Sequence, residues 1–192
     1  MMATLIVIRS IYQARQPTKC GRSPFYAFDV ATFRETAVTD ERARTLLTEY
    51  FASRARTFPR SQGTYRTTLP SPEQFVPPRG VFLILVAENP AGEAADVGCG
   101  GIRAVAPSPT GAVRYEVKHL WLQPELRGHG CGAALLAELQ RRAAAFGATE
   151  IVLDTNTSQQ AAERLYTRSG YRQIEPFNDN PNATAWYSKT LP

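Results

Sequence analysis

Apolar residues recur along this 192-residue chain with two spacings, one typical of helices and one typical of strands. After Thr39 or Asp40, either of which can cap a helix, apolar side chains at positions 43, 46, 47, 50 and 51 predict a helix to about residue 56. A second helical series follows residue 130 and closes at Gly147, and a third covers residues 158–168 and closes at Gly170. The pattern therefore predicts three amphipathic helices.

Short apolar or β-prone runs lie between these helices. They predict strands at residues 31–36, 81–87, 97–105, 113–122, 149–154, 171–174 and 185–191. Residues 57–80 contain five prolines and two glycines, which predicts a long loop with one helical turn at residues 72–75. Loops of this length inside a compact domain are usually functional. The order of elements predicts a mixed α/β domain.

The strand predicted at residues 113–122 changes its apolar face partway along. Positions 113, 115 and 117 are apolar and odd, whereas Leu120 and Leu122 are apolar and even. Side chains alternate between the two faces of a strand, so this change near His119 predicts one extra residue, a β-bulge. A bulge bends the strand and releases backbone groups from pairing.

The sequence RGHGCGA at residues 127–133 joins this strand to the second helix. Several unpaired N–H groups and the positive end of the helix dipole meet there, and both favour an anion. Gly128, Gly130 and Gly132 allow a close approach of the backbone, and Arg127 adds charge. The segment therefore predicts a pyrophosphate site, with a simple tight turn as the alternative.

The same segment partly matches a dinucleotide-binding fingerprint. Gly128, Gly130 and Ala133 fit G-x-G-x-x-A, and Asp154 ends the next strand. Five residues, including Pro124, separate the preceding strand from the first glycine, however, and antiparallel elements surround the single strand–helix–strand unit. These two features disfavour the dinucleotide interpretation.

Charge and composition narrow the classes of partner. The 22 Lys and Arg residues against 17 Asp and Glu give a net charge of +5, of which residues 1–28 carry +4. The remainder is nearly neutral, which argues against a nucleic-acid partner. We expect residues 1–28 to form a basic, disordered extension and residues 29–192 to form one domain.

Compartment and membrane association are also addressed by the sequence. Three widely spaced cysteines without a C-x-x-C pair favour a reducing cytoplasm. No apolar stretch approaches the roughly 18 residues that span a bilayer, and the N-terminus lacks the features of a signal peptide. We expect a cytoplasmic protein with no membrane partner.

The motifs together resemble the GNAT superfamily of acyl-CoA-dependent N-acyltransferases. Its signature Q/R-x-x-G-x-G/A appears as Arg127, Gly130 and Gly132, between the strand YEVKHLWLQPEL and the helix GAALLAELQRRA. The resemblance continues through IVLD to RLYTRSGY and covers residues 97–191 best. It implies a mixed sheet of six or seven strands, flanked by helices, in which the bulged central strand splays from its parallel neighbour. Acetyl-CoA would lie in that opening.

The resemblance also implies roles for individual residues. A backbone N–H of Leu120 or Leu122 would stabilise the thioester oxygen, Glu116 would take the proton of the acceptor ammonium, and Tyr166 would protonate the CoA thiolate. The alternatives are an exposed Glu116, a Glu116 paired with Arg103 or Arg114, and a core position for Tyr166. Cofactor contacts are expected from Leu120, Trp121, Leu122, Arg127, Gly128, His129, Gly130, Cys131, Gly132, Ala133 and Asn156.

These roles predict direct acetyl transfer to a primary amine of a small molecule or peptide. A covalent intermediate is not expected, since no Ser-His or Cys-His pair stands out as a catalytic pair near the glycine motif. No metal is expected either, because His119 and His129 lack companion ligands. The alternative is a non-catalytic acyl-CoA-binding module, and a homodimer stays open.

We expect residues 57–80 and 177–183 to line the acceptor site, but neither segment carries a recognisable motif, and only a charge pattern bears on the acceptor. Four arginines in and beside the long loop favour a carboxylate or phosphate on the acceptor, with a solvated loop as the alternative; they are Arg56, Arg60, Arg66 and Arg79.

Overall fold

A computed structural model describes residues 30–88 and 93–192. The strands are β1 (Val30–Glu35), β2 (Gly80–Glu88), β3 (Ala94–Val105), β4 (Arg114–Leu122), β5 (Glu150–Thr155), β6 (Arg172–Ile174) and β7 (Ala185–Thr190). The α-helices are α1 (Glu41–Thr57), α2 (Cys131–Ala145) and α3 (Gln160–Arg168), with 3-10 turns at Arg60–Gln62, Pro72–Phe75 and Pro124–Leu126. The predicted N-terminal extension, residues 1–28, lies outside the described residues.

All predicted elements are present, and their ends shift for local reasons. Asp40 rather than Thr39 caps α1, since its carboxylate accepts a hydrogen bond from the Arg42 N–H at 2.9 Å. Helix α3 begins at Gln160 rather than at residue 158, because Asn156 holds the preceding segment in a turn: its side chain accepts from Ser158 N–H and its carbonyl from Gln159 N–H.

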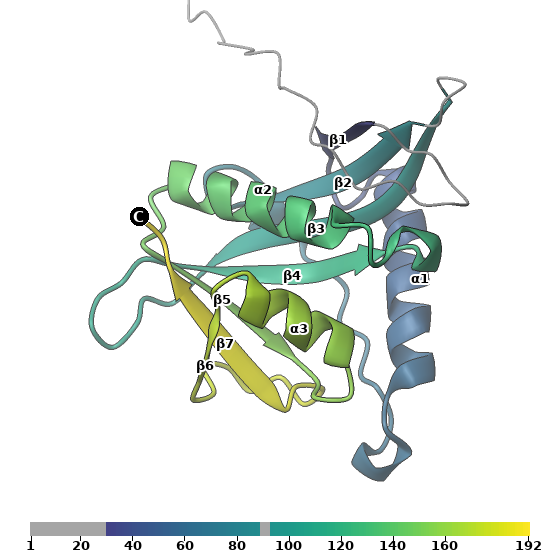
Figure 1. Cartoon of the computed structure of the whole chain (residues 1–192). Coiled ribbons are helices and arrows are strands. Elements are labelled where there is room, and N and C mark those ends of the chain that lie inside the picture. Colours follow the sequence, from purple (N-terminus) through teal and green to yellow (C-terminus); the bar gives the residue numbers. More distant parts are fainter. Residues whose placement is uncertain (1–29, 89–92) are drawn as a thin grey trace, which may run out of the picture.

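The seven strands form one mixed sheet in the order β1-β2-β3-β4-β5-β7-β6. The pairing of β4 with β5 is parallel, and the other neighbouring pairs are antiparallel. Helices α2 and α3 cover one face of the sheet, and α1 packs against the other face (Figure 1). The predicted α/β class, strand number and flanking helices are confirmed.

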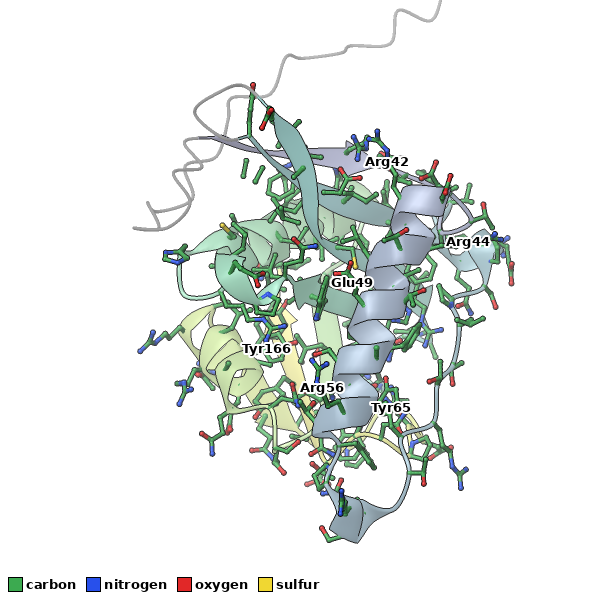
Figure 2. All side chains as sticks on the ribbon, turned by 90° about the vertical axis from the view of Figure 1, so that its right-hand side faces the viewer. Arg42, Arg44, Glu49, Arg56, Tyr65 and Tyr166 are labelled. Carbon is green, nitrogen blue, oxygen red and sulfur yellow. The ribbon has the colours of Figure 1, made fainter. Side chains whose placement is uncertain are left out.

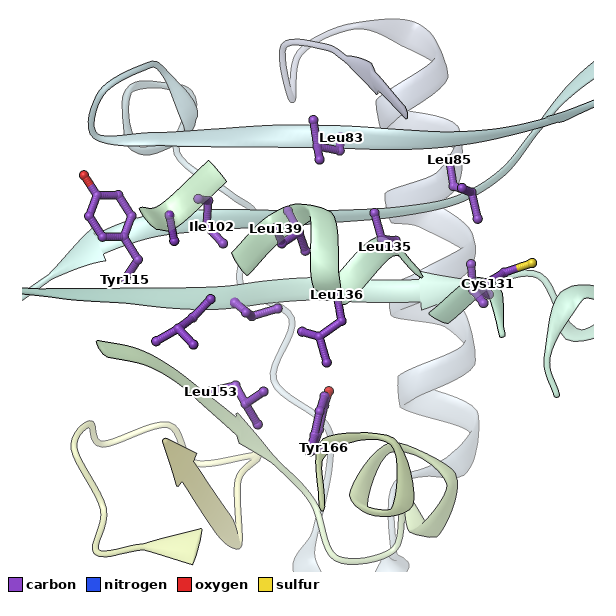
Figure 3. Packing of buried hydrophobic residues seen from close by; sticks show 14 of the residues in the cluster. Leu83, Leu85, Ile102, Tyr115, Cys131, Leu135, Leu136, Leu139, Leu153 and Tyr166 are labelled. Carbon is purple, nitrogen blue, oxygen red and sulfur yellow. The ribbon is translucent and has the colours of Figure 1, made fainter. Parts of the chain in front are cut away.

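Burial on both faces follows from the sequence of the central strands. In β2, Leu83 and Leu85 belong to the cluster under α2, while Phe82 and Ile84 belong to the cluster under α1. Figure 3 shows the first cluster, in which the leucines of α2 pack onto the sheet. A strand that is buried on both sides has a continuous apolar sequence, which explains the run VFLILVA.

The predicted bulge in β4 is confirmed. The β3–β4 register steps from Gly101 opposite Lys118 to Cys99 opposite Trp121, so two residues of β4 face Gly100 alone. His119 has a φ of 55°, which an L-residue seldom adopts and which bends the strand. Beyond the bulge, even-numbered instead of odd-numbered residues face the core under α2, as predicted. Val117, before the bulge, and Leu122, after it, therefore lie in the same cluster.

The bulge separates β4 from β5. Their parallel pairing joins Arg114–Glu116 to Glu150–Val152. Beyond these residues the carboxyl halves of β4 and β5 are no longer paired with each other. The splay that the family resemblance implied is therefore present. It opens the sheet at the end where the glycine segment follows β4.

Glycine at position 101 makes room for an aromatic ring at this bulge. A Cβ on Gly101 would lie 2.6 Å from the Phe75 ring. We expect Gly101→Ala to lower the free energy of unfolding by about 1 to 3 kcal/mol, because Phe75 must move. Gly100→Ala should cost less, since its Cβ meets flexible leucine ends at 3.1 and 3.2 Å. Urea unfolding measures both, and equal costs would contradict the argument.

Candidate active site

A cavity of about 1010 Å³ lies at the splay. Its walls come from α1, residues 65–75, the carboxyl half of β4, the glycine segment, the end of β5, α3 and residues 178–183. It is large enough for an extended ligand together with a second, smaller molecule. Figure 2 views the molecule onto α1, with Tyr65 and Tyr166 beside the C-terminal half of this helix.

The glycine segment fits an anionic ligand. Gly128 and Gly130 have φ values of 82° and 83°, and an ideal Cβ on either would have no protein atom within 4 Å. Gly130 is the N-cap of α2 and, as a glycine, makes no side-chain cap hydrogen bond to the helix. Both glycines line the cavity, together with Gly132 and Ala133. Open space at the positive end of a helix suits a pyrophosphate.

Arg127 lines the cavity and also fixes the end of β4. Its guanidinium donates to the carbonyl of Leu122 through Nε at 3.1 Å and Nη2 at 2.9 Å. The arginine thus brings positive charge beside the glycines in a fixed position.

Leu120 and Leu122 present backbone N–H groups to the opening. The next residue, Gln123, donates its N–H to Val97, toward β3. Since N–H groups alternate between the two edges of a strand, those of Leu122 and Leu120 point away from β3, toward the gap beside β5. Both residues line the cavity, which agrees with the predicted oxyanion position.

Three other predicted cofactor residues do not line the cavity. His129 lies outside it, and the Cys131 side chain is buried in the core under α2 (Figure 3). Asn156 is buried, and its amide donates to Gln62 at 2.6 Å and to the Asn182 carbonyl at 3.0 Å. Trp121 does line the cavity, with its side chain in the cluster under α1.

Tyr166 lines the cavity and also belongs to the hydrophobic core under α2 and α3. Its ring contacts Tyr171 and Tyr187, with centroids 5.9 and 6.0 Å away, and only 6% of the residue is exposed. Burial raises the pKa of its hydroxyl to about 12, and the hydroxyl is within electrostatic reach of Arg54, which lowers the pKa, and Asp154, which raises it. The phenol therefore keeps its proton at neutral pH.

Glu116 is buried beneath the cavity rather than exposed to it. It is 1% exposed and absent from the cavity lining. Its oxygens accept from Arg103 at 2.7 Å, Lys118 at 3.1 Å and Asn178 at 3.0 Å. The predicted pairing with Arg103 is confirmed, whereas the exposed alternative and the pairing with Arg114 are wrong. The carboxylate has no direct access to the cavity in this arrangement.

Lys118 and Asp154 extend this network to the cavity surface. The Lys118 ammonium lies 3.2 Å from Asp154, which also accepts from Asn178 at 2.7 Å and Asn180 at 2.9 Å. Burial by itself would raise the pKa of Asp154, but Lys118 and the two amides hold it below its usual value. Asp154 thus stays ionised and is a weak base.

Residues 178–183 line the cavity, as expected for residues 177–183, but the roles of their asparagines were not predicted. Asn178 and Asn180 hold Asp154, and Asn182 exchanges two hydrogen bonds with the backbone of Arg66, at 2.9 and 2.8 Å. A signal was present in the sequence, because asparagine recurs at every second position and its side chain favours turns in which it bonds the backbone two residues on.

His119 contributes an uncharged wall. Its ring packs against Tyr50, Phe51 and Phe75, with centroids 5.4, 5.5 and 6.1 Å away. Burial, with the charges of Lys118 and Arg103, lowers its pKa to about 3. The imidazole is therefore neutral at physiological pH and contributes an uncharged aromatic ring to the wall.

The arginines predicted near the acceptor are only partly at the cavity. Arg66 lines it, whereas Arg56, Arg60 and Arg79 do not. Arg54, two residues before Arg56 on α1, lines it instead.

Among residues 30–88 and 93–192, no three His, Cys, Asp or Glu side chains come together in a way that could hold a metal ion. In the same part of the chain, no helix is long and apolar enough to cross a bilayer.

Three features are typical of acyl-CoA-dependent acyltransferases: the splayed parallel strand pair, the bulge in β4 and the glycine segment at the start of α2. The sequence matches the acetyltransferase (GNAT) family over residues 42–171, and the chain belongs to this family. The predicted family and enzyme class are thereby confirmed. The dinucleotide-binding alternative is wrong, since its fold requires a mostly parallel sheet.

Individual relatives agree with this assignment. The chain is 33% identical over 117 residues to an uncharacterized N-acetyltransferase of Schizosaccharomyces pombe, covering 60% of this chain and 66% of the relative. It is 33% identical over 81 residues to an IAA acetyltransferase of Azospirillum brasilense, covering 42% and 50%. The chain thus spans about half to two thirds of the length of these relatives.

Solved structures show the same fold. A candidate acyl-CoA N-acyltransferase from Klebsiella pneumoniae superposes with a TM-score of 0.58 at 29% identity, covering 84% of this chain and 97% of that one. A GNAT-family acetyltransferase from Staphylococcus aureus Mu50 gives 0.63 at 17% identity, covering 85% and 100%.

Proposed function

We propose that this protein transfers an acetyl group from acetyl-CoA directly to a primary amine of a small molecule or a peptide. The acceptor nitrogen forms an amide bond with the acetyl carbon, and the carbon–sulfur bond breaks. The ammonium must lose a proton before attack, and the departing thiolate must gain one. Acetyl-CoA supplies the activated acyl group, and the residues at the splay bind, orient and exchange protons.

The observation that carries this proposal is the open glycine segment beside two strand N–H groups that point away from β3, into the gap between β4 and β5. Gly128, Gly130 and the start of α2 offer donors for the pyrophosphate, and Arg127 offers charge. The N–H groups of Leu120 and Leu122 suit a developing oxyanion in the gap between β4 and β5.

We assign a positioning role to Glu116 rather than a direct base role. Its carboxylate fixes Arg103 and Lys118, and through Lys118 it orients Asp154 at the cavity surface. The acceptor then loses its proton to water in the cavity. This assignment replaces the direct proton transfer that the family resemblance implied.

The proposal is tested with purified full-length protein, acetyl-CoA and a panel of amino acids, polyamines, aminoglycosides and peptides. Release of free CoA thiol is the readout. Thiol release that depends on both the amine and the enzyme supports acetyl transfer. Tight acetyl-CoA binding without turnover of any amine would instead support the non-catalytic binding module.

Tyr166→Phe is expected to lower kcat about 100-fold while acetyl-CoA affinity stays the same, because a general acid acts in the chemical step and not in binding. The pKa of about 12 keeps the hydroxyl protonated, so activity due to Tyr166 should not decline below about pH 11. Steady-state kinetics and calorimetry measure these quantities.

Tyr171→Phe is the matched control for Tyr166→Phe. Tyr171 is a neighbouring buried tyrosine, and it is not part of the cavity lining. Equal losses of kcat in the two variants would assign Tyr166 a packing role only.

A further inference from the structure

Arg54 is a cavity arginine without a partner. It projects from the last turn of α1, is partly buried and lines the cavity. Within residues 30–88 and 93–192 its guanidinium has neither an ion pair nor a hydrogen bond. Arg103 and Lys118 in the same cavity are neutralised by Glu116 and Asp154. A partly buried charge without a counter-ion is costly, which points to a ligand that supplies one.

The position of Arg54 matches the reacting end of the cavity. Its charge acts on the hydroxyls of both Tyr166 and Tyr50, lowering the pKa of each against the stronger effect of burial. An anion bound by Arg54 would therefore lie close to the group proposed to protonate the thiolate.

The remaining charges disfavour a polycationic acceptor. Asp154 is the one carboxylate among the described residues that line the cavity, and Lys118 and two asparagines already hold it. A polyamine or an aminoglycoside would find no free counter-charge there, whereas a single carboxylate would find Arg54.

Aromatic side chains define the rest of the acceptor. Tyr50, Phe51, Phe75 and the neutral ring of His119 pack against one another on the α1 side of the cavity. Tyr50 and Phe51 lie one helical turn before Arg54 on α1, and all four residues line the cavity with it. This wall suits an apolar or aromatic substituent.

We infer that Arg54 binds the carboxylate of the acceptor, and that the acceptor is an amino acid with an apolar or aromatic side chain. The inference rests on the proposed acetyl transfer and names its substrate class. Arg66, Arg164 and Arg168 also line the cavity but are exposed, so Arg54 is the one partly buried arginine of the lining without an ion pair among the described residues. A carboxylate is favoured over a phosphate there, since one guanidinium matches one negative charge, whereas a phosphate group carries about −1.5 to −2.

The experiment compares two probes that differ in the charged group. Phenylacetate carries the carboxylate and lacks the amine, and phenethylamine carries the amine and lacks the carboxylate. Each is titrated by calorimetry into the full-length protein saturated with CoA. We expect phenylacetate to bind, and Arg54→Gln to weaken its binding about 10- to 100-fold. Arg54→Lys should give an intermediate loss, because it keeps the charge and loses the bidentate geometry.

Arg56→Gln is the matched control. Arg56 lies in the same last turn of α1, where both arginines favour the helix dipole, but it is exposed and does not line the cavity. It should leave phenylacetate binding unchanged. If circular dichroism shows that Arg54→Gln is unfolded, the phenylacetate affinity of Arg54→Lys is compared with those of the wild type and Arg56→Gln instead.

Kinetics give a second readout. The ratio of kcat/KM for phenylalanine to that for phenethylamine should exceed one in the wild type and should fall about 10-fold or more in Arg54→Gln. A fall confined to this variant supports the inference.

Three results would overturn the inference: no phenylacetate binding to the wild type, equal effects of Arg54→Gln and Arg56→Gln, or an equal loss of acetyl-CoA affinity in Arg54→Gln. The last result would make Arg54 a contact of the CoA phosphates. Failure of the wild type to bind acetyl-CoA, by contrast, contradicts the proposed function itself.

Discussion

Gly130→Asp is expected to weaken acetyl-CoA binding about 1,000-fold, which corresponds to about 4 kcal/mol, while the fold is retained. The substitution places a carboxylate over the open start of α2, where the pyrophosphate is proposed to bind. Like charges repel, and the new side chain also competes for the N–H groups. No protein atom lies within 4 Å of the introduced Cβ, so the loss does not come from a clash in the folded chain.

Gly111→Asp is the control for backbone strain in this experiment. Gly111 has a φ of 86°, close to the 83° of Gly130, and its Cβ would also meet no atom within 4 Å. It lies in the turn between β3 and β4 and does not line the cavity. Calorimetry should find its acetyl-CoA affinity unchanged. If a folded Gly130→Asp protein keeps wild-type affinity, the glycine segment is not the pyrophosphate site.

Glu116→Gln is expected to destabilise the protein by about 3 kcal/mol, since removing one partner of a buried ion pair leaves the other charges uncompensated. Arg103 and Lys118 both depend on this carboxylate, and Asp154 alone would remain for Lys118. For a domain of this size, the loss corresponds to a decrease of about 10 °C in Tm. Urea and thermal unfolding measure it.

Glu150→Gln is the control for Glu116→Gln. Glu150 pairs with Arg114 on the same parallel strand pair, but its side chain is 17% exposed and has one cationic partner. Both partners of this pair retain some access to solvent, so the substitution should cost less, about 1 to 2 kcal/mol. Similar costs for the two variants would contradict the view of Glu116 as the centre of the buried network.

The pH dependence of kcat separates the positioning role of Glu116 from a base role. A base would make the loss in Glu116→Gln largest at lower pH, where more of the acceptor is protonated. The positioning role predicts a pH profile of wild-type shape between about pH 6 and 9. A loss that grows toward pH 6 in folded protein would restore Glu116 as the base.

The sequence by itself determined the elements, the bulge and the glycine segment that precedes α2. Parity reversal near His119 located the bulge, because strand alternation is a local property that the order of apolar residues records directly. Gly128 and Gly130 were found for a similar reason. A backbone with positive φ favours glycine, so the glycines in the sequence indicate where this backbone geometry occurs.

Only the tertiary structure decided the surroundings of the reactive side chains. Glu116 has the same strand parity whether it is exposed or buried, and its burial depends on Arg103, Lys118 and Asn178, which lie on three different segments. Asn156 likewise has donors suited to a ligand, but the fold uses them for Gln62 and Asn182. Such partners are set by contacts between distant segments, which no local period encodes.

At the acceptor end of the cavity, the residue types were likewise known from the sequence, and the fold decided their placement. The loop arginines were visible in the sequence, but helix geometry directs Arg54 to the cavity and leaves Arg56 exposed, since residues two apart on a helix lie on different sides. Whether an arginine is neutralised depends on which carboxylates the fold brings near it. The sequence thus determined the bulged strand and the glycine segment of a splayed sheet, and the packing of α1 against that sheet decided which charges of the cavity lining are neutralised.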